Sequence, residues 1–172
     1  MKYPPNTSDF LISEVAELYN AEIQLTLALP NVQRMFASTF LEPLLSGYLR
    51  SGWNNASQLG LAKKMLAHDD CNEFSDCMTL LIDECQEACG IPIRHVRITS
   101  LLSCLQRINY FKLAIYENTH GLSRLQGFSE VSAILGRLLG RELTFREKLT
   151  QASLHHHAPV GLREHQTVSL SR

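Results

Sequence analysis

The stretch ELYNAEIQLTLALP, residues 17–30, decides how the rest of the chain is interpreted. It belongs to an expected helix whose apolar positions recur in steps of three and four, the spacing of one buried helix face. These positions are Leu11, Val15, Leu18, Glu22, Leu25 and Leu29. A carboxylate, Glu22, therefore stands where a leucine is expected. Because a buried carboxylate must be paired with a cation, bonded to a metal or protonated, the pattern predicts a dedicated partner for Glu22.

The composition is that of an ordinary globular chain. It has 172 residues, of which 45% are hydrophobic and 19% charged, enough to bury one sizeable core. The formal net charge of -1 provides no field that would attract nucleic acid or an anionic membrane. We therefore expect neither nucleic acid nor membrane among the partners.

The chain shows neither a secretory signal nor a membrane span. Its first ten residues, MKYPPNTSDF, lack an apolar run, and no stretch approaches the ~20 apolar residues of a membrane helix. The five cysteines include no CxxC pair, so the spacing does not indicate zinc. They are Cys71, Cys77, Cys85, Cys89 and Cys104. A cytoplasmic protein with reduced, packed thiols is the expectation, and nothing marks one thiol as a nucleophile.

The first helix is expected to begin at Ser8 or Asp9, either of which can cap it. It should run to about Leu29, because Pro30 removes a backbone donor and so ends or kinks the helix. In the second case residues 31–37 continue it on a new axis.

A second helix is expected from about Ser38 or Thr39 to Leu66, with Pro43 in its first turns. The acidic connection HDDCNEFSD follows, and a short helix is expected over residues 75–88. Glycines within the second helix weaken it by about 1 kcal/mol each relative to alanine, so packing must hold it.

The third and fourth long helices are expected over residues 99–119, closed by Gly121, and residues 130–149. From residue 153 the helical pattern stops, which predicts a flexible tail over 153–172 that contains His155 to His157. The sequence thus predicts one all-α domain over residues 8–152, a four-helix bundle with one short extra helix between its second and third long helices.

Each long helix has polar residues near its own middle, and in an up-down bundle the middles meet at one height. The sequence therefore predicts one buried polar layer. Its members are Glu22, Tyr48, Ser51, Asn55, Asn109, Lys112 and Glu142. Two carboxylates and no histidine are too few for a dinuclear site, since hard cations take about six ligands.

Lys112 decides the interpretation of this layer. Its ammonium placed between Glu22 and Glu142 would satisfy both carboxylates without a metal, and we predict this salt bridge. Two alternatives remain open: Lys112 extends to solvent beside the seam, or the carboxylates lie at the rim of the bundle. No catalytic residue is predicted, because a Ser51–Lys112 pair would lack an oxyanion donor.

Several stretches resemble the YciF-like group of ferritin-like proteins. The first helix carries most of the resemblance, the short helix, third and fourth helices carry the rest, and together they span residues 8–152. The matching positions are Leu18, Tyr19, Ala21, Glu22, Gln24, Leu29, Pro30, Met78, Leu81, Ile82, Glu84, Gln106, Arg107, Ala114, Tyr116, Glu142, Lys148 and Leu149.

The resemblance implies a ferritin-like bundle that forms a homodimer, carries a dinuclear metal site and is associated with bacterial stress responses. This sequence departs from the group at the metal ligands. Tyr48 and Ser51 stand in place of the group's histidine and glutamate. In the third helix Asn109, Tyr110 and Lys112 replace glutamate, histidine and glutamate.

The sequence therefore favours a metal-free, non-catalytic, degenerate ferritin-like bundle that acts through self-association or a protein partner. No cofactor is expected. The alternative is a protein with oxidoreductase or metal-handling activity that retains iron or manganese at Glu22 and Glu142. A third hypothesis is a small-ligand pocket at the glycine-rich centre of the second helix.

Overall fold

The computed structural model describes residues 6–66 and 74–157, and within these ranges it contains helices and no strand. The helices are α1 (Thr7–Met35), α2 (Glu42–Met65), α3 (Asp76–Cys89), α4 (Arg94–Leu125) and α5 (Ser129–His157). None of these helices is long and apolar enough to cross a membrane. The all-α bundle with one short extra helix that the sequence predicted is confirmed.

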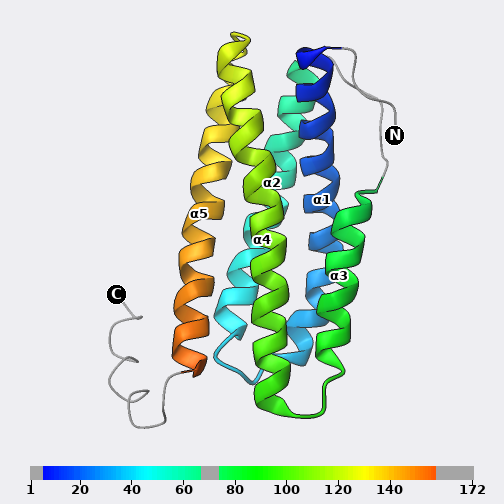
Figure 1. Cartoon of the computed structure of the whole chain (residues 1–172), viewed down its shortest axis with the longest axis vertical. Coiled ribbons are helices and arrows are strands. Elements are labelled where there is room, and N and C mark those ends of the chain that lie inside the picture. Colours follow the sequence, from blue (N-terminus) through cyan, green and yellow to red (C-terminus); the bar gives the residue numbers. More distant parts are fainter. Residues whose placement is uncertain (1–5, 67–73, 158–172) are drawn as a thin grey trace.

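α1 and α5 run in one direction and α2 and α4 in the other, so neighbouring long helices are antiparallel, and the shorter α3 lies beside α1 and α4 (Figure 1). α2 packs against α1 and α5, and α4 packs against α1, α3 and α5. Consequently α2 and α4 lie diagonally across the bundle, and side chains from all four long helices can meet at its axis.

The core consists of two apolar clusters. One cluster contains α3 and includes Leu25, Met78 and Leu101. The other packs the opposite half of the long helices and includes Leu59 and Leu135. Along each long helix, the residues of one cluster are followed by polar residues near the middle and then by residues of the other cluster. These polar residues are described below.

Pro30 does not end the first helix. α1 continues to Met35 with Pro30 inside it, which agrees with the alternative of a continued helix. The burial of Val32 and Phe36 in the α3-containing cluster stabilises the helix beyond the proline and offsets the cost of the lost backbone hydrogen bond. α2 then begins at Glu42, later than expected, with Pro43 in its first turn, where a missing backbone donor costs little.

α4 is longer at both ends than the sequence indicated, and Gly121 does not close it. Ile98 is buried before the expected start, and Ser123 is buried after the expected end. A glycine within a helix costs only about 1 kcal/mol, which packing of the flanking residues outweighs. The positive-φ glycine that follows the helix is Gly127, with φ of 80°.

α5 extends to His157, so residues 153–157 belong to the helix and not to the predicted tail. Phe40 holds this last turn: its ring lies 5.3 Å from that of His155 and stacks 6.0 Å from that of His156. The remaining part of the predicted tail, 158–172, lies outside the described residues, as does most of the acidic connection.

The start of α3 is fixed on α1 by a polar clasp. Gln24 accepts a hydrogen bond from the backbone N–H of Ser75 at 2.8 Å and donates to the carbonyl of the same residue at 3.2 Å. Ser75 also caps α3 and donates to Glu17. The clasp sets the position of α3 against α1 and α4, and so the position of its cysteines.

Candidate functional site

The polar residues of the four long helices meet in one buried layer near the middle of the bundle. α1 contributes Glu22, and α5 contributes Glu142. α2 and α4 contribute residues from the faces that point to the bundle axis. The members with side chains in this network are Glu22, Tyr48, Asn55, Asn109, Lys112, Tyr116 and Glu142, each at most 2% exposed. We call these residues the polar layer.

Lys112 is the cation of the polar layer. Its Nζ atom lies 2.7 Å from Oε1 of Glu22 and 2.9 Å from Oε1 of Glu142, and all three side chains are almost fully buried. The same nitrogen donates to the hydroxyl of Tyr48 at 3.2 Å. Lys112 thus makes three polar contacts, and it neither extends to solvent nor leaves the carboxylates at the rim.

Amide and phenol donors complete the coordination of the carboxylates. Asn55 Nδ2 lies 3.1 Å from Oε1 of both Glu22 and Glu142. Asn109 donates to Oε2 of Glu142 at 2.9 Å, and the Tyr116 hydroxyl donates to Oε1 of Glu22 at 3.1 Å. Glu142 therefore has donors on both of its oxygens, whereas every donor to Glu22 converges on one oxygen.

Two buried oxygens of the layer have no hydrogen-bond partner: Oε2 of Glu22 and Oδ1 of Asn109. Gly52 of α2 faces the first of them, and a Cβ atom there would lie 3.5 Å from Glu22 Oε2 and 2.6 Å from Thr26 Cγ2. The absence of a side chain at position 52 is therefore what allows α2 to approach α1 at the layer.

Burial and mutual charge set the protonation of the layer. Burial raises the pKa of Glu22, with Lys112 opposing and the nearby Glu142 reinforcing that shift. Burial disfavours the charged form of Lys112, but the two carboxylates outweigh it and hold its pKa well above the usual value. Burial also raises the pKa of Tyr48 and Tyr116 well above normal, so both hydroxyls remain donors.

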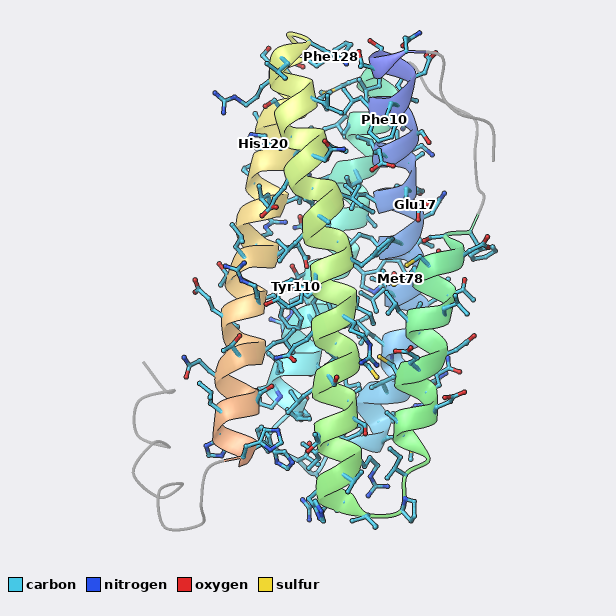
Figure 2. The ribbon with its side chains drawn as sticks, viewed as in Figure 1. Phe10, Glu17, Met78, Tyr110, His120 and Phe128 are labelled. Atoms are coloured by element: carbon cyan, nitrogen blue, oxygen red, sulfur yellow. The ribbon has the colours of Figure 1, made fainter. Side chains whose placement is uncertain are left out.

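One residue expected in the layer is not part of it. Ser51 is only half-buried and has no hydrogen bond to a layer member, because the helix turn brings the neighbouring Gly52 to the inner face instead. Tyr110, labelled on α4 in Figure 2, is 57% exposed and also lies outside the layer.

Two residues that contribute to the layer were not assigned to it from the sequence. Tyr116 lies four residues after Lys112, one helix turn away on the same face, and this spacing was the available signal. Arg141, beside Glu142 on α5, donates to Oδ1 of Asn55 at 3.3 Å and to Asn54 at 2.7 Å. Arg141 orients the Asn55 amide so that its Nδ2 group points to the carboxylates.

The donor set of the layer does not fit a dinuclear metal centre. Such a centre needs about six oxygen or nitrogen ligands for each hard cation. The layer offers two carboxylates, and the ammonium of Lys112 contacts both of them. Among the described residues, no group of three or more His, Cys, Asp or Glu side chains is placed to hold a metal ion.

Comparison with known proteins gives a family and a fold. A family model described as a domain of unknown function (DUF892) matches residues 6–158. The crystal structure of the E. coli stress protein YciF is similar, with a TM-score of 0.84 and 21% identity over 89% of this chain and 98% of that chain. YcfI from Rhodopseudomonas palustris has a TM-score of 0.78 and 22% identity, over 84% and 93%. No curated protein matches the sequence significantly.

Proposed function

Since this chain belongs to the family defined by the domain of unknown function DUF892, we propose that it is a metal-free, non-catalytic, degenerate ferritin-like bundle that acts by self-association. The proposal that the bundle is metal-free is supported by the position of Lys112 between Glu22 and Glu142. An ammonium ion and a divalent cation repel each other and compete for the same carboxylates. The lysine therefore takes the role that a metal ion would have in holding the helix middles together.

The surface formed by α1 and α2 supports self-association. It contains a hollow of about 420 Å³, which α1 lines with Tyr19 and Ile23 and α2 lines with Trp53, Ala56, Ser57, Gly60, Leu61 and Lys64. We call it the α1–α2 face. Large apolar side chains stand exposed on or beside it: Leu27 at 62%, Trp53 at 52% and Leu61 at 44%.

Trp53 is half-exposed and lines one part of a hollow whose lining also includes the small residues Ala56, Ser57 and Gly60, and we infer that this combination makes the α1–α2 face complementary to itself. In a two-fold dimer, Trp53 of each copy would enter the hollow of the other, as an isologous interface requires. Exposed aromatic side chains are also typical anchors of protein interfaces. A second copy of this chain is therefore the partner we propose.

Sedimentation equilibrium of the full chain, purified without a histidine tag, tests this proposal. The wild type should be a dimer at micromolar concentration, and Trp53→Glu should be a monomer with unchanged helicity. The matched control is Tyr110→Glu, which places the same charge at an equally exposed aromatic on the diagonal helix α4 and should remain dimeric. A monomeric wild type, or dissociation of both variants, would overturn self-association through the α1–α2 face.

One observation favours the alternative of a residual metal at Glu22 and Glu142: Glu22 Oε2 is buried without a hydrogen-bond partner. Elemental analysis after incubation with iron(II) or manganese(II) and exhaustive dialysis distinguishes a metal-free bundle from one that retains a metal ion. We expect far less than one ion per chain. One or more retained ions per chain would show that Lys112 moves aside and would restore the metal-handling hypothesis.

We extend to this chain the stress association of its structural neighbour, which is a stress protein. The bundle fold shared with that protein is the support for this step. The measurement is the amount of this protein in its native host with and without oxidative and osmotic stress. Unchanged amounts under every stress would contradict this association without affecting the dimer.

A further inference from the structure

Three thiols gather where α3 packs against the first half of α4. Cys85 of α3 and Cys104 of α4 are both buried, each with 4% of its surface exposed, and Cys89 is half-buried beside them. Cys85 and Cys104 belong to the same core cluster, where α3 packs against α4, and the interaction between the two thiols shifts the pKa of each. Two sulfurs from different helices are therefore adjacent, at positions that are separated by nineteen residues in the sequence.

Arg107 places a positive charge on this pair. Its Nη2 atom donates to the Sγ atom of Cys104 at 3.3 Å. The guanidinium is held in that position by Glu84, which accepts from Nε at 2.9 Å, and by Ser103, which accepts from Nη1 at 3.1 Å. Arg107 thus stabilises negative charge on Cys104, while Glu84 is the carboxylate that faces the same guanidinium from α3.

A groove leads from solvent to Cys104. It encloses about 500 Å³, and α3 lines it with Glu84, Glu87 and Ala88, while α4 lines it with Thr99, Ser100, Ser103, Cys104 and Arg107. Cys85 does not line this groove. A small uncharged polar molecule can therefore approach Cys104 beside a guanidinium, three hydroxyl groups and two carboxylates, while Cys85 lies in the core cluster that Cys104 shares.

The pKa values of the two thiols differ, and Cys104 is the one that forms a thiolate more readily. The interaction with Cys85, together with Arg107 and against the effect of burial, lowers the pKa of Cys104 to about 7. The same interaction and burial raise the pKa of Cys85, so that Cys85 stays a thiol. By contrast, burial and Glu17 raise the pKa of the exposed Cys77.

We propose that Cys104 is a hydroperoxide-reactive thiolate and that Cys85 resolves its oxidised form into a disulfide joining α3 and α4. The substrate class is a small hydroperoxide, ROOH, including hydrogen peroxide. The reaction is stoichiometric and does not depend on the α1–α2 face or on the polar layer, so this proposal stands apart from the proposed function.

The chemistry has two balanced steps. The Cys104 thiolate attacks the terminal oxygen of the hydroperoxide, the O–O bond breaks, and ROH leaves after taking a proton, which gives a sulfenic acid on Cys104. The sulfur of Cys85 then attacks the Cys104 sulfur as its own proton leaves. The S–O bond breaks and water departs, so that two thiols and one ROOH yield one disulfide, ROH and water.

Peptide mapping by mass spectrometry of the full chain tests this directly. The background carries Cys71→Ser, because Cys71 lies outside the described residues. Equimolar hydrogen peroxide at pH 7 should produce a Cys85–Cys104 disulfide as the main product, which dithiothreitol reverses. In Cys85→Ser the sulfenic acid should persist on Cys104 and be trapped by dimedone, whereas Cys77→Ser, which removes a thiol outside the cluster, should behave as the wild type.

Arg107→Gln tests whether the guanidinium activates Cys104, or whether the closeness of the Cys85 and Cys104 thiols is sufficient for the reaction. It should raise the pH midpoint of Cys104 alkylation by roughly one unit and slow peroxide oxidation at pH 7 roughly fivefold, because fewer molecules carry a thiolate. The matched control on the same helix, Arg97→Gln, lies near Cys89 and should leave that midpoint unchanged. Preferential oxidation of Cys77, a Cys89-containing disulfide, or equal reactivity of all thiols would overturn the proposal.

Discussion

The ammonium nitrogen of Lys112 and Oε1 of Glu22 lie 2.7 Å apart in a part of the bundle where neither side chain is exposed to solvent. Because neither side chain reaches solvent, bulk water cannot take the place of a lost charge at either position. Replacing an entire buried ion pair by apolar groups can be neutral, whereas removing one partner leaves an uncompensated charge. Predictions about the layer therefore concern single substitutions and their dependence on pH.

Lys112→Met should lower the free energy of unfolding by about 3–5 kcal/mol at neutral pH, because it leaves two buried carboxylates without a cation. The loss should diminish in acid, because burial raises the pKa of Glu22 and a protonated Glu22 no longer needs a cation. Denaturant unfolding between pH 4 and 8, at about one-unit steps, measures both effects. Lys148→Met, at an exposed position of α5, is the control and should change stability by less than about 0.5 kcal/mol; equal stability of both variants would refute the salt bridge.

Glu22→Gln should cost less than Glu142→Gln. A glutamine oxygen at position 22 keeps all the donors that converge on Oε1, and its amide replaces an oxygen that has no partner. At position 142 the new amide would face the Nδ2 donor of Asn109, so two donors would meet. We expect a difference of about 1–3 kcal/mol, the cost of an unsatisfied buried group, by chemical denaturation. The reverse order would contradict the described orientation of the layer.

The same pair predicts a pH dependence. The folded protein holds a proton on Glu22 more tightly than the unfolded chain does, because burial raises the pKa of that group. Glu22 therefore contributes stability that is present below its unfolded pKa and is lost as pH rises through its folded pKa. The unfolding free energy of the wild type minus that of Glu22→Gln should accordingly increase as the pH is lowered from neutral toward about 4.5, and a constant difference would exclude the raised pKa.

Gly52→Ala should destabilise the protein by about 1–3 kcal/mol through overpacking, because the new Cβ would lie 2.6 Å from Thr26 Cγ2. Thr26→Ser removes that methyl group and keeps the hydroxyl that donates to the Ile23 carbonyl. In this background Gly52→Ala should cost much less, which a double-mutant cycle of melting curves measures. Gly47→Ala, where nothing lies within 4 Å of the new atom, should stabilise by about 0.5–1 kcal/mol.

Lys112→Glu should convert the layer from a salt bridge into a cation site. Three carboxylates with Asn55 and Asn109 would form an oxygen-rich cluster, and such clusters favour hard divalent ions. Manganese(II) should raise the melting temperature of this variant and leave that of the wild type unchanged, with magnesium-free buffer as the reference. Absence of any metal-dependent shift in Lys112→Glu would contradict the mutual placement of Glu22, Lys112 and Glu142.

The residues at the middle of the bundle were predictable because they interrupt strong apolar stripes. Glu22 and Glu142 occupy leucine positions, and the position of Lys112 on the α4 stripe placed its charge between them. Ser51 was assigned to the layer because it is a polar residue near the middle of the second helix, three residues after Tyr48, although its neighbour Gly52 occupies the inner face. The error is one residue. Periodicity cannot place a face more accurately than this in a helix whose middle is polar and contains glycine.

The packing of α3 against α4 was not visible in the sequence. The proximity of Cys85 and Cys104 depends on how the clasp of Gln24 and Ser75 seats α3, and periodicity within one helix carries no such information. Helix ends were missed for a related reason. Pro30 and Gly121 disfavour a helix locally by a few kcal/mol at most, and the burial of the residues beyond them outweighs that cost.

The polar layer separates two apolar clusters, and this arrangement has a consequence for how the bundle unfolds. Sliding α1, α4 or α5 by one turn would bury a charge of the layer in hydrocarbon, and sliding α2 would bury the Asn55 amide there, so neither half can adopt a register that the other does not share. The two halves should therefore melt as a single cooperative unit, and amide hydrogens in both should exchange only by global opening. Lys112 would then couple the two ends of the molecule, and its loss would allow them to fray independently.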